Sequence, residues 1–96
     1  MGKPVGVQVP PSALMYYVYV LKSIKTGQYY KGLTDDIERR IKEHISGFSI
    51  TTKKYLPLKL IFVQICENRI EARELEKYLK SGYGREIIKE IDFFVG

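Results

Sequence analysis

Two short segments rich in aromatic and β-branched residues lie near the start of the chain, Tyr16–Ser23 and Gln28–Leu33, joined by a four-residue link that ends at Gly27. Aromatic and β-branched side chains favour extended backbone, and a short link containing glycine brings two strands together. The sequence therefore predicts a β-hairpin.

The pairing register of this hairpin decides which tyrosines share a face. A Ser23–Gln28 pair at the turn places Leu21 opposite Tyr30. It also places Tyr19 opposite Gly32, so that Tyr19 and Tyr30 become diagonal neighbours on one face. Because glycine has no side chain, we expect open space beside Tyr19, bordered by two phenols as a shallow hollow.

A first helix is expected between Thr34, a favourable N-cap residue, and Gly47, a favourable stop. Its predicted buried stripe consists of three isoleucines at four-residue spacing: Ile37, Ile41 and Ile45. Arg40 and His44 are also four residues apart, so they share a face of this helix next to the stripe. Their side chains are expected to reach the edge of the sheet.

The second half of the chain predicts a third strand over Leu58–Cys66, followed by two helices. Asn68 is a favourable N-cap for the first of these helices. Its predicted core stripe is Ala72, Leu75 and Leu79. Glu76 borders that stripe and is expected to be half-buried. Gly82 and Gly84 are expected to end this helix, and Arg85–Ile91 to form a short last helix with three residues facing inward: Ile87, Ile88 and Ile91.

The predicted order is thus ββαβαα, an α+β fold with a three-stranded antiparallel sheet flanked by helices. With 96 residues, the chain has room for one domain, which we expect over residues 15–96. Residues 1–14 carry three of the four prolines and no periodicity, so a disordered extension is expected there, with Met15 as the natural start.

The composition of the chain indicates what kind of partner and which cellular compartment to expect. The net charge of +5 favours a polyanionic partner such as nucleic acid. The apolar runs are far shorter than the ~20 residues that a membrane-spanning helix needs, so no membrane partner is expected. The single cysteine, Cys66, cannot form an internal disulfide. It is expected to be a buried small hydrophobic residue, and the chain to be cytoplasmic.

From Tyr16 to Lys89 the sequence resembles the GIY-YIG nuclease superfamily, in particular its short stand-alone bacterial members and the nuclease domains of excision-repair enzymes and of homing endonucleases. Two tripeptides mark the first two strands of that family, and Tyr17-Val18-Tyr19 and Tyr30-Lys31-Gly32 stand in their places. Arg40 and His44 match the family's positions on the following helix. Glu76 matches its acidic residue on the next.

The resemblance implies a metal-dependent endonuclease that hydrolyses phosphodiester bonds in DNA, with DNA repair or recombination as its setting. It implies catalytic roles for Tyr19, Tyr30, Arg40, His44 and Glu76. Glu76 would hold one divalent cation, Mg²⁺ or Mn²⁺, and Arg40 would pair with the phosphate. One tyrosine, with Tyr19 preferred, would position or deprotonate the attacking water. This requires nearby positive charge, because a free phenol has a pKa near 10. His44 is expected to hydrogen-bond a tyrosine or a phosphate.

Further basic and aromatic side chains are candidates for holding nucleic acid: Lys53, Lys54, Tyr55, Lys77, Lys80 and Arg85. Tyr55 is available to stack on an unpaired base. Two alternatives stay open at this point. The first is a nucleic-acid-binding module of the same fold with little or no turnover on its own. The second is a protein-interaction domain without a nucleic-acid role, which predicts no salt-dependent affinity for DNA.

Overall fold

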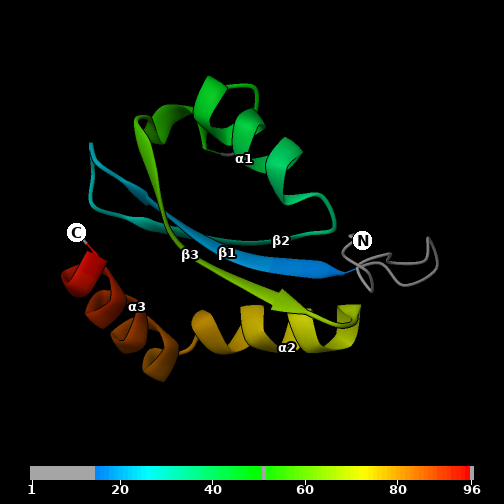
Figure 1. Cartoon of the computed structure of the whole chain (residues 1–96). Helices are drawn as coiled ribbons and strands as arrows, with labels where there is room; N and C mark the ends of the chain where they lie inside the picture. Colours follow the sequence, from blue (N-terminus) through cyan, green and yellow to red (C-terminus); the bar gives the residue numbers. More distant parts are fainter. Residues whose placement is uncertain (1–14, 51, 96) are drawn as a thin grey trace, which may run out of the picture.

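The computed structural model describes residues 15–50 and 52–95, and the predicted N-terminal extension lies outside them. The elements in chain order are β1 (Tyr16–Ser23), β2 (Tyr29–Thr34), α1 (Ile37–Ser46), the short 3-10 helix η1 (Lys53–Tyr55), β3 (Leu58–Cys66), α2 (Arg69–Leu79) and α3 (Gly82–Val95). Figure 1 shows α1 on one face of the sheet and α2 and α3 on the other. The predicted order ββαβαα and the α+β fold class are confirmed.

The sheet has the strand order β2-β1-β3, and both pairs of neighbouring strands are antiparallel. Tyr19 pairs with Gly32 and Leu21 with Tyr30, as the length of the turn predicts. Because β1 is the central strand, its middle is fully buried, while β2 and β3 form the two edges. The predicted hairpin and its register are therefore correct.

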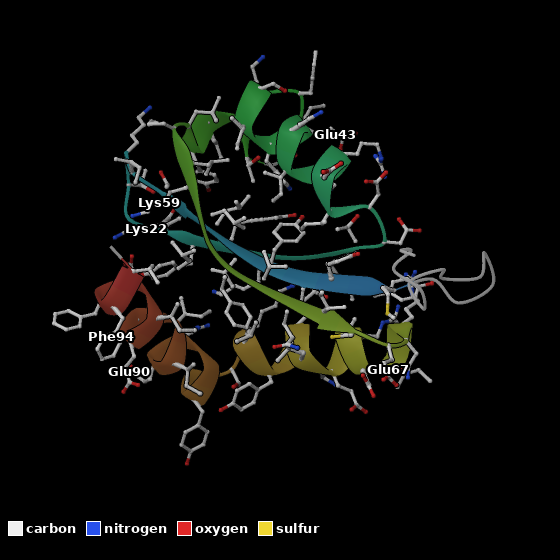
Figure 2. All side chains as sticks on the ribbon, in the orientation of Figure 1. Lys22, Glu43, Lys59, Glu67, Glu90 and Phe94 are labelled. Carbon is white, nitrogen blue, oxygen red and sulfur yellow. The ribbon has the colours of Figure 1, made fainter. Side chains whose placement is uncertain are left out.

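The main core lies between the sheet and the layer formed by α2 and α3. Val18 and Val20 of β1 pack there with Ala72 and Leu79 of α2 and Ile88 of α3. Lys22, labelled in Figure 2, donates a hydrogen bond to Asp92 Oδ2 near the end of α3. The Tyr29 hydroxyl donates to the same oxygen, so α3 is tied to the turn end of the hairpin. Cys66 is buried, as expected.

The opposite face of the sheet is covered by α1, and here the predicted isoleucine stripe is wrong. His44 is fully buried, whereas Ile45 is 53% exposed, and Ile37 and Ile41 are half-buried. An α-helix turns once every 3.6 residues, so successive steps of four drift around the helix axis. His44, three positions after Ile41, stays on the inner side, and Ile45 has rotated away from it.

Two helix ends also differ from expectation. The N-cap of α1 is Asp36, whose side chain accepts from the Arg39 amide, while the Thr34 hydroxyl accepts from the Asp36 amide just before the helix. Gly47 ends α1 in the left-handed region, with φ of 86°, as predicted. Gly82 begins α3 instead of ending α2.

The last helix is longer than expected and is rotated slightly from the predicted orientation. Gly84 lies inside its first turn, packed so closely on the backbone of Leu79 that a Cβ would overlap it. Ile88 is fully buried, as predicted, but Ile87 is 39% exposed and Ile91 is half-buried. The close glycine contact sets how α3 approaches α2, which short-range periodicity does not reveal. Among residues 15–50 and 52–95, no helix has the length and apolar character needed to cross a bilayer.

Candidate active site

Residues from β1, β2, α1 and α2 border one surface hollow of about 260 Å³, which we call the edge hollow. It is lined by Tyr19, Tyr30, Gly32, Leu33, Arg40, Arg69, Arg73 and Glu76. Since α1 and α2 lie on opposite faces of the sheet (Figure 1), their side chains meet beside the edge strand β2. Tyr19, Tyr30, Arg40 and Glu76, all predicted as site residues, are thus brought together.

Gly32 does not leave open space beside Tyr19, contrary to expectation. A Cβ at Gly32 would overlap the phenol ring of Tyr19, so that ring already occupies the space above the glycine. Without a side chain at this position, Tyr19 can pass across β2 from the central strand and reach the edge hollow. The glycine therefore positions the tyrosine.

His44 links Tyr19 to the segment that follows α1. Its Nε2 lies 3.0 Å from the Tyr19 hydroxyl oxygen, and its Nδ1 lies 2.7 Å from the Thr52 hydroxyl oxygen. All three side chains are buried. Burial lowers the pKa of His44, and the positive charge of Arg40 lowers it further. The imidazole is therefore neutral near pH 7, with one ring nitrogen donating and the other accepting.

Tyr30 completes an aromatic cluster with Tyr19 and His44. The ring centroid of Tyr30 lies 6.4 Å from that of Tyr19 and 5.2 Å from that of His44, with all rings tilted. Tyr30 is half-buried, so part of its side chain remains accessible from the edge hollow. The two tyrosines share a face of the sheet, as the register predicts.

The environment of Tyr19 stabilises its protonated form. Burial and the neighbouring Tyr30 raise its pKa to about 12, and the charge of Arg40 opposes this only in part. The expected positive charge is present, but it does not outweigh the loss of solvation. With only the protein's own groups around it, Tyr19 is therefore a neutral, protonated phenol near pH 7.

Arg40 is held by an ion pair on its own helix. Its Nη1 donates to Glu43 Oε1 over 2.7 Å, and Glu43, labelled on α1 in Figure 2, also pairs with Arg39. The hydrogen bond from Arg40 lowers the pKa of Glu43, so the pair is charged on both sides. Arg40 is half-buried and keeps donors free toward the edge hollow.

Glu76 is half-buried, with 23% of its side chain exposed, and its Oε2 lies 3.5 Å from Lys80 Nζ. Among the described residues that line the edge hollow, it alone carries a carboxylate. The described residues contain no group of three or more His, Cys, Asp or Glu side chains close enough to share a metal ion. One carboxylate with water completing the shell suits Mg²⁺, which retains several waters when bound. The donor set therefore fits that ion and does not fit zinc.

Arg69 and Arg73 were not predicted as site residues. They precede Glu76 on α2 by seven and three positions, so helical spacing puts all three on one side of the helix. Arg69 also borders a neighbouring hollow that contains Arg39 and Arg40. Arginines thus line the β2 edge from both α1 and α2. The spacing to Glu76 was the signal that could have identified them.

The predicted nucleic-acid-binding residues fall into two groups, and none of them is among the residues that line the edge hollow. Lys53, Lys54 and Tyr55 form η1. Lys77 on α2, Lys80 directly after α2 and Arg85 on α3 are all exposed. Lys80 and Arg85 lie near Lys31, whose pKa is lowered by burial and then by these two charges. This second group therefore includes a basic cluster on the α2–α3 side of the sheet.

Residues 15–89 match the family model described as the GIY-YIG catalytic domain. A UPF0213 protein from Clostridium perfringens is 40% identical over 67 residues, which are 69% of this chain and 71% of the relative. Another, from Streptococcus pneumoniae, is 42% identical over 65 residues, or 67% of this chain and 65% of the relative. The solution NMR structure of a UPF0213 protein from Bacillus halodurans superimposes with a TM-score of 0.50 and 32% identity, covering 80% of this chain and 84% of that one.

Proposed function

The chain belongs to the GIY-YIG family of nuclease domains, and on that premise we propose that it is a metal-dependent endonuclease that hydrolyses phosphodiester bonds in DNA. The observation that carries the proposal is the edge hollow, where Tyr19, Arg40 and Glu76 meet from three separate elements. Phosphodiester hydrolysis needs a site for an anion, a route for a proton and stabilisation of the leaving oxygen. The edge hollow and the side chains next to it contain a candidate group for each of these three requirements.

The arginines supply the anion site. Arg40, Arg69 and Arg73 line the edge hollow against one carboxylate, so its charge is net positive. A guanidinium presents its donors in a planar fork that matches two phosphate oxygens. Arg40, held from behind by Glu43, would bind the scissile phosphate, and the two arginines of α2 would hold neighbouring phosphates.

Tyr19 and His44 supply the proton route. With a pKa of about 12, Tyr19 is a weak acid that gives up its own proton most readily when another group accepts it. The attacking water would transfer a proton to the Tyr19 oxygen as the phenol proton moves to His44 Nε2, 3.0 Å away. The water oxygen then bonds to phosphorus, the bond to the leaving oxygen breaks, and the leaving oxygen takes up a proton from a solvent water. The proton held by His44 returns through Tyr19 to solvent after the product leaves. Tyr30 would orient the phosphate from the other side.

Glu76 would hold the divalent cation that we propose as cofactor, Mg²⁺ or Mn²⁺. Such an ion, when bound, supplies positive charge to the phosphate and the leaving oxygen. Glu76 is among the residues that line the edge hollow, and its half-buried position limits competition from bulk water. Lys80, at 3.5 Å, would move aside when the cation binds, since its side chain is 57% exposed.

The ion pair between Lys80 and Glu76 favours a second candidate function, which is nucleic-acid binding with little turnover. Lys80 neutralises part of the carboxylate that a cation requires, and in that role the arginines alone would hold the strand. Substitution of Lys80 with alanine separates the candidates, because it would lower the metal concentration needed by a nuclease. It would leave a pure binding module inactive.

The experiment that tests the proposal incubates the purified chain with supercoiled, branched and single-stranded DNA in Mg²⁺, Mn²⁺ or chelator. Cleavage that requires the metal supports the nuclease, and preference for branched DNA would support a role in repair or recombination. Binding of all three substrates without cleavage in either metal would support the binding module. Absence of salt-dependent binding would reject both candidates.

A further inference from the structure

A second hollow, of about 640 Å³, adjoins the edge hollow and shares Tyr30 with it. We call it the turn hollow. It lies between the hairpin turn, η1 and the start of β3, and residues that line it include Gln28, Tyr30, Lys54, Tyr55 and Leu58. Its volume is within the range of about 300–1,000 Å³ typical of pockets for small organic groups.

The lining of the turn hollow combines aromatic faces with uncompensated positive charge. Tyr30 and Tyr55 are both half-buried, so each ring is held in place while part of it faces the hollow. Lys54 Nζ lies 5.3 Å from the centroid of the Tyr55 ring. Among the described residues that line the turn hollow, none is acidic. This chemistry suits a flat aromatic group attached to an anion.

The turn hollow is held in shape by hydrogen bonds between η1 and the hairpin. The hydroxyl of Ser23, which is buried, donates to the Tyr55 carbonyl oxygen over 2.7 Å. The Ile24 amide donates to the Pro57 carbonyl oxygen over 2.9 Å. Both bonds use backbone atoms of the loop, so neither of them is removed when the side chain of Tyr55 is replaced.

We propose that the turn hollow binds one unpaired nucleobase of the substrate strand, next to the phosphate that Arg40 holds. This inference rests on the proposed function and specifies its substrate. Because Tyr30 borders both hollows, a strand whose phosphate lies in the edge hollow can place an adjacent base in the turn hollow, against the same side chain. Tyr30 and Tyr55 would stack on that base, and Lys54 would hold its backbone phosphate.

A base paired within a duplex cannot enter this hollow without first leaving the stack, which costs free energy. An unpaired base in a single strand, a flap or a junction avoids most of that cost. The turn hollow therefore selects single-stranded or branched substrates over intact duplex.

The test measures binding in chelator, where no cleavage occurs. Fluorescence anisotropy compares a single-stranded oligonucleotide with a duplex of the same length, using the full chain and three variants: Tyr55→Ala, Tyr55→Phe and Tyr83→Ala. Tyr83 is the matched control because it is 80% exposed on α3 and lines neither hollow. Tyr55→Phe keeps the stacking ring.

Tyr55→Ala is expected to weaken single-strand binding roughly fivefold or more, with little effect on duplex binding. Tyr55→Phe and Tyr83→Ala are expected to bind both substrates like the unchanged chain. Equal loss on single strand and duplex, or no loss at all, would overturn the inference. Thermal melting of each variant shows whether Tyr55→Ala is folded.

A second measurement uses the unchanged chain and does not depend on any variant folding. A series of single strands carries one abasic residue at successive positions, and one position is expected to weaken binding. A uniform response along the strand would overturn the inference. Because both measurements are made without metal, base-selective binding without any later cleavage would reject the nuclease alone. Cleavage without base selectivity would reject the turn hollow alone.

Discussion

The Nε2 atom of His44 lies 3.0 Å from the hydroxyl oxygen of Tyr19, and both side chains are almost fully removed from solvent. The other ring nitrogen contacts the Thr52 hydroxyl at 2.7 Å, so the imidazole is engaged on both sides. A polar residue in this position is tolerated because its hydrogen-bonding groups are satisfied. The contact joins β1, α1 and the loop before η1.

We expect this contact to make stability depend on pH. His44 has a folded-state pKa below the ordinary value, so its contribution is complete above the unfolded pKa near 6.5 and is lost as pH falls through the lower folded value. His44 is the single histidine of the chain. Urea unfolding at pH 7.5 and 5.5 should show a loss of at most about 1.4 kcal/mol per pH unit.

The control for this prediction is His44→Gln, which keeps a polar side chain but does not titrate in that range. The difference in unfolding free energy between the two proteins should shrink as pH falls from 7.5 to 5.5. A constant difference over that interval would contradict a neutral, buried His44.

Removal of the Tyr19 hydroxyl should affect chemistry more than folding. Tyr19→Phe keeps the ring over Gly32 but loses the group that would transfer the proton, so single-turnover cleavage should fall by about 10²–10⁴-fold. Stability should fall by about 1–3 kcal/mol, because His44 Nε2 loses its buried partner. Tyr83→Phe on α3 serves as control, and equal cleavage rates for the two variants would contradict the assignment.

Gly32→Ala tests whether the glycine positions Tyr19. The added methyl overlaps the phenol ring, so the ring must move, at a cost of about 1–3 kcal/mol in stability and a large loss of cleavage. Gly84→Ala, which meets the backbone of Leu79, should lower stability without a specific loss of activity at temperatures where it is folded. Normal cleavage by folded Gly32→Ala would contradict this role.

Arg69 and Arg73 should contribute to DNA binding through phosphates alone. Substitution of either with alanine should weaken binding to all DNA sequences alike and reduce the slope of log affinity against log salt by about one. Titrations at several salt concentrations measure that slope. Lys89→Ala on α3 provides the control, since Lys89 pairs with Glu86 outside the edge hollow. An unchanged slope for both arginine variants would remove them from the site.

Local sequence rules were sufficient where the structure depends on neighbours along the chain. The four-residue turn set the register of Tyr19 against Gly32, and Asn68 began α2 by accepting from the Glu71 amide. Local sequence rules were insufficient where tertiary packing decides which side chains are buried. The burial of His44 depends on Tyr19 and Thr52, which are 25 and 8 positions away.

The candidate site was predicted in part for the same reason. The motif positions identified Tyr19, Tyr30, Arg40 and Glu76, which do line one hollow. Helical spacing puts Arg69 and Arg73 on the same side of α2 as Glu76. Their position opposite Arg40, however, depends on α1 and α2 approaching the same edge of the sheet from opposite faces, which no single-helix pattern contains. The turn hollow depends likewise on how η1 packs against the hairpin.

The most direct test of the central claim compares binding and cleavage of one oligonucleotide by the unchanged chain and by Glu76→Gln. Glutamine keeps the shape of the side chain and removes the charge that would hold the cation. The account predicts equal or tighter binding in chelator together with loss of Mg²⁺-dependent cleavage. Undiminished cleavage by Glu76→Gln would contradict the edge hollow as the active site.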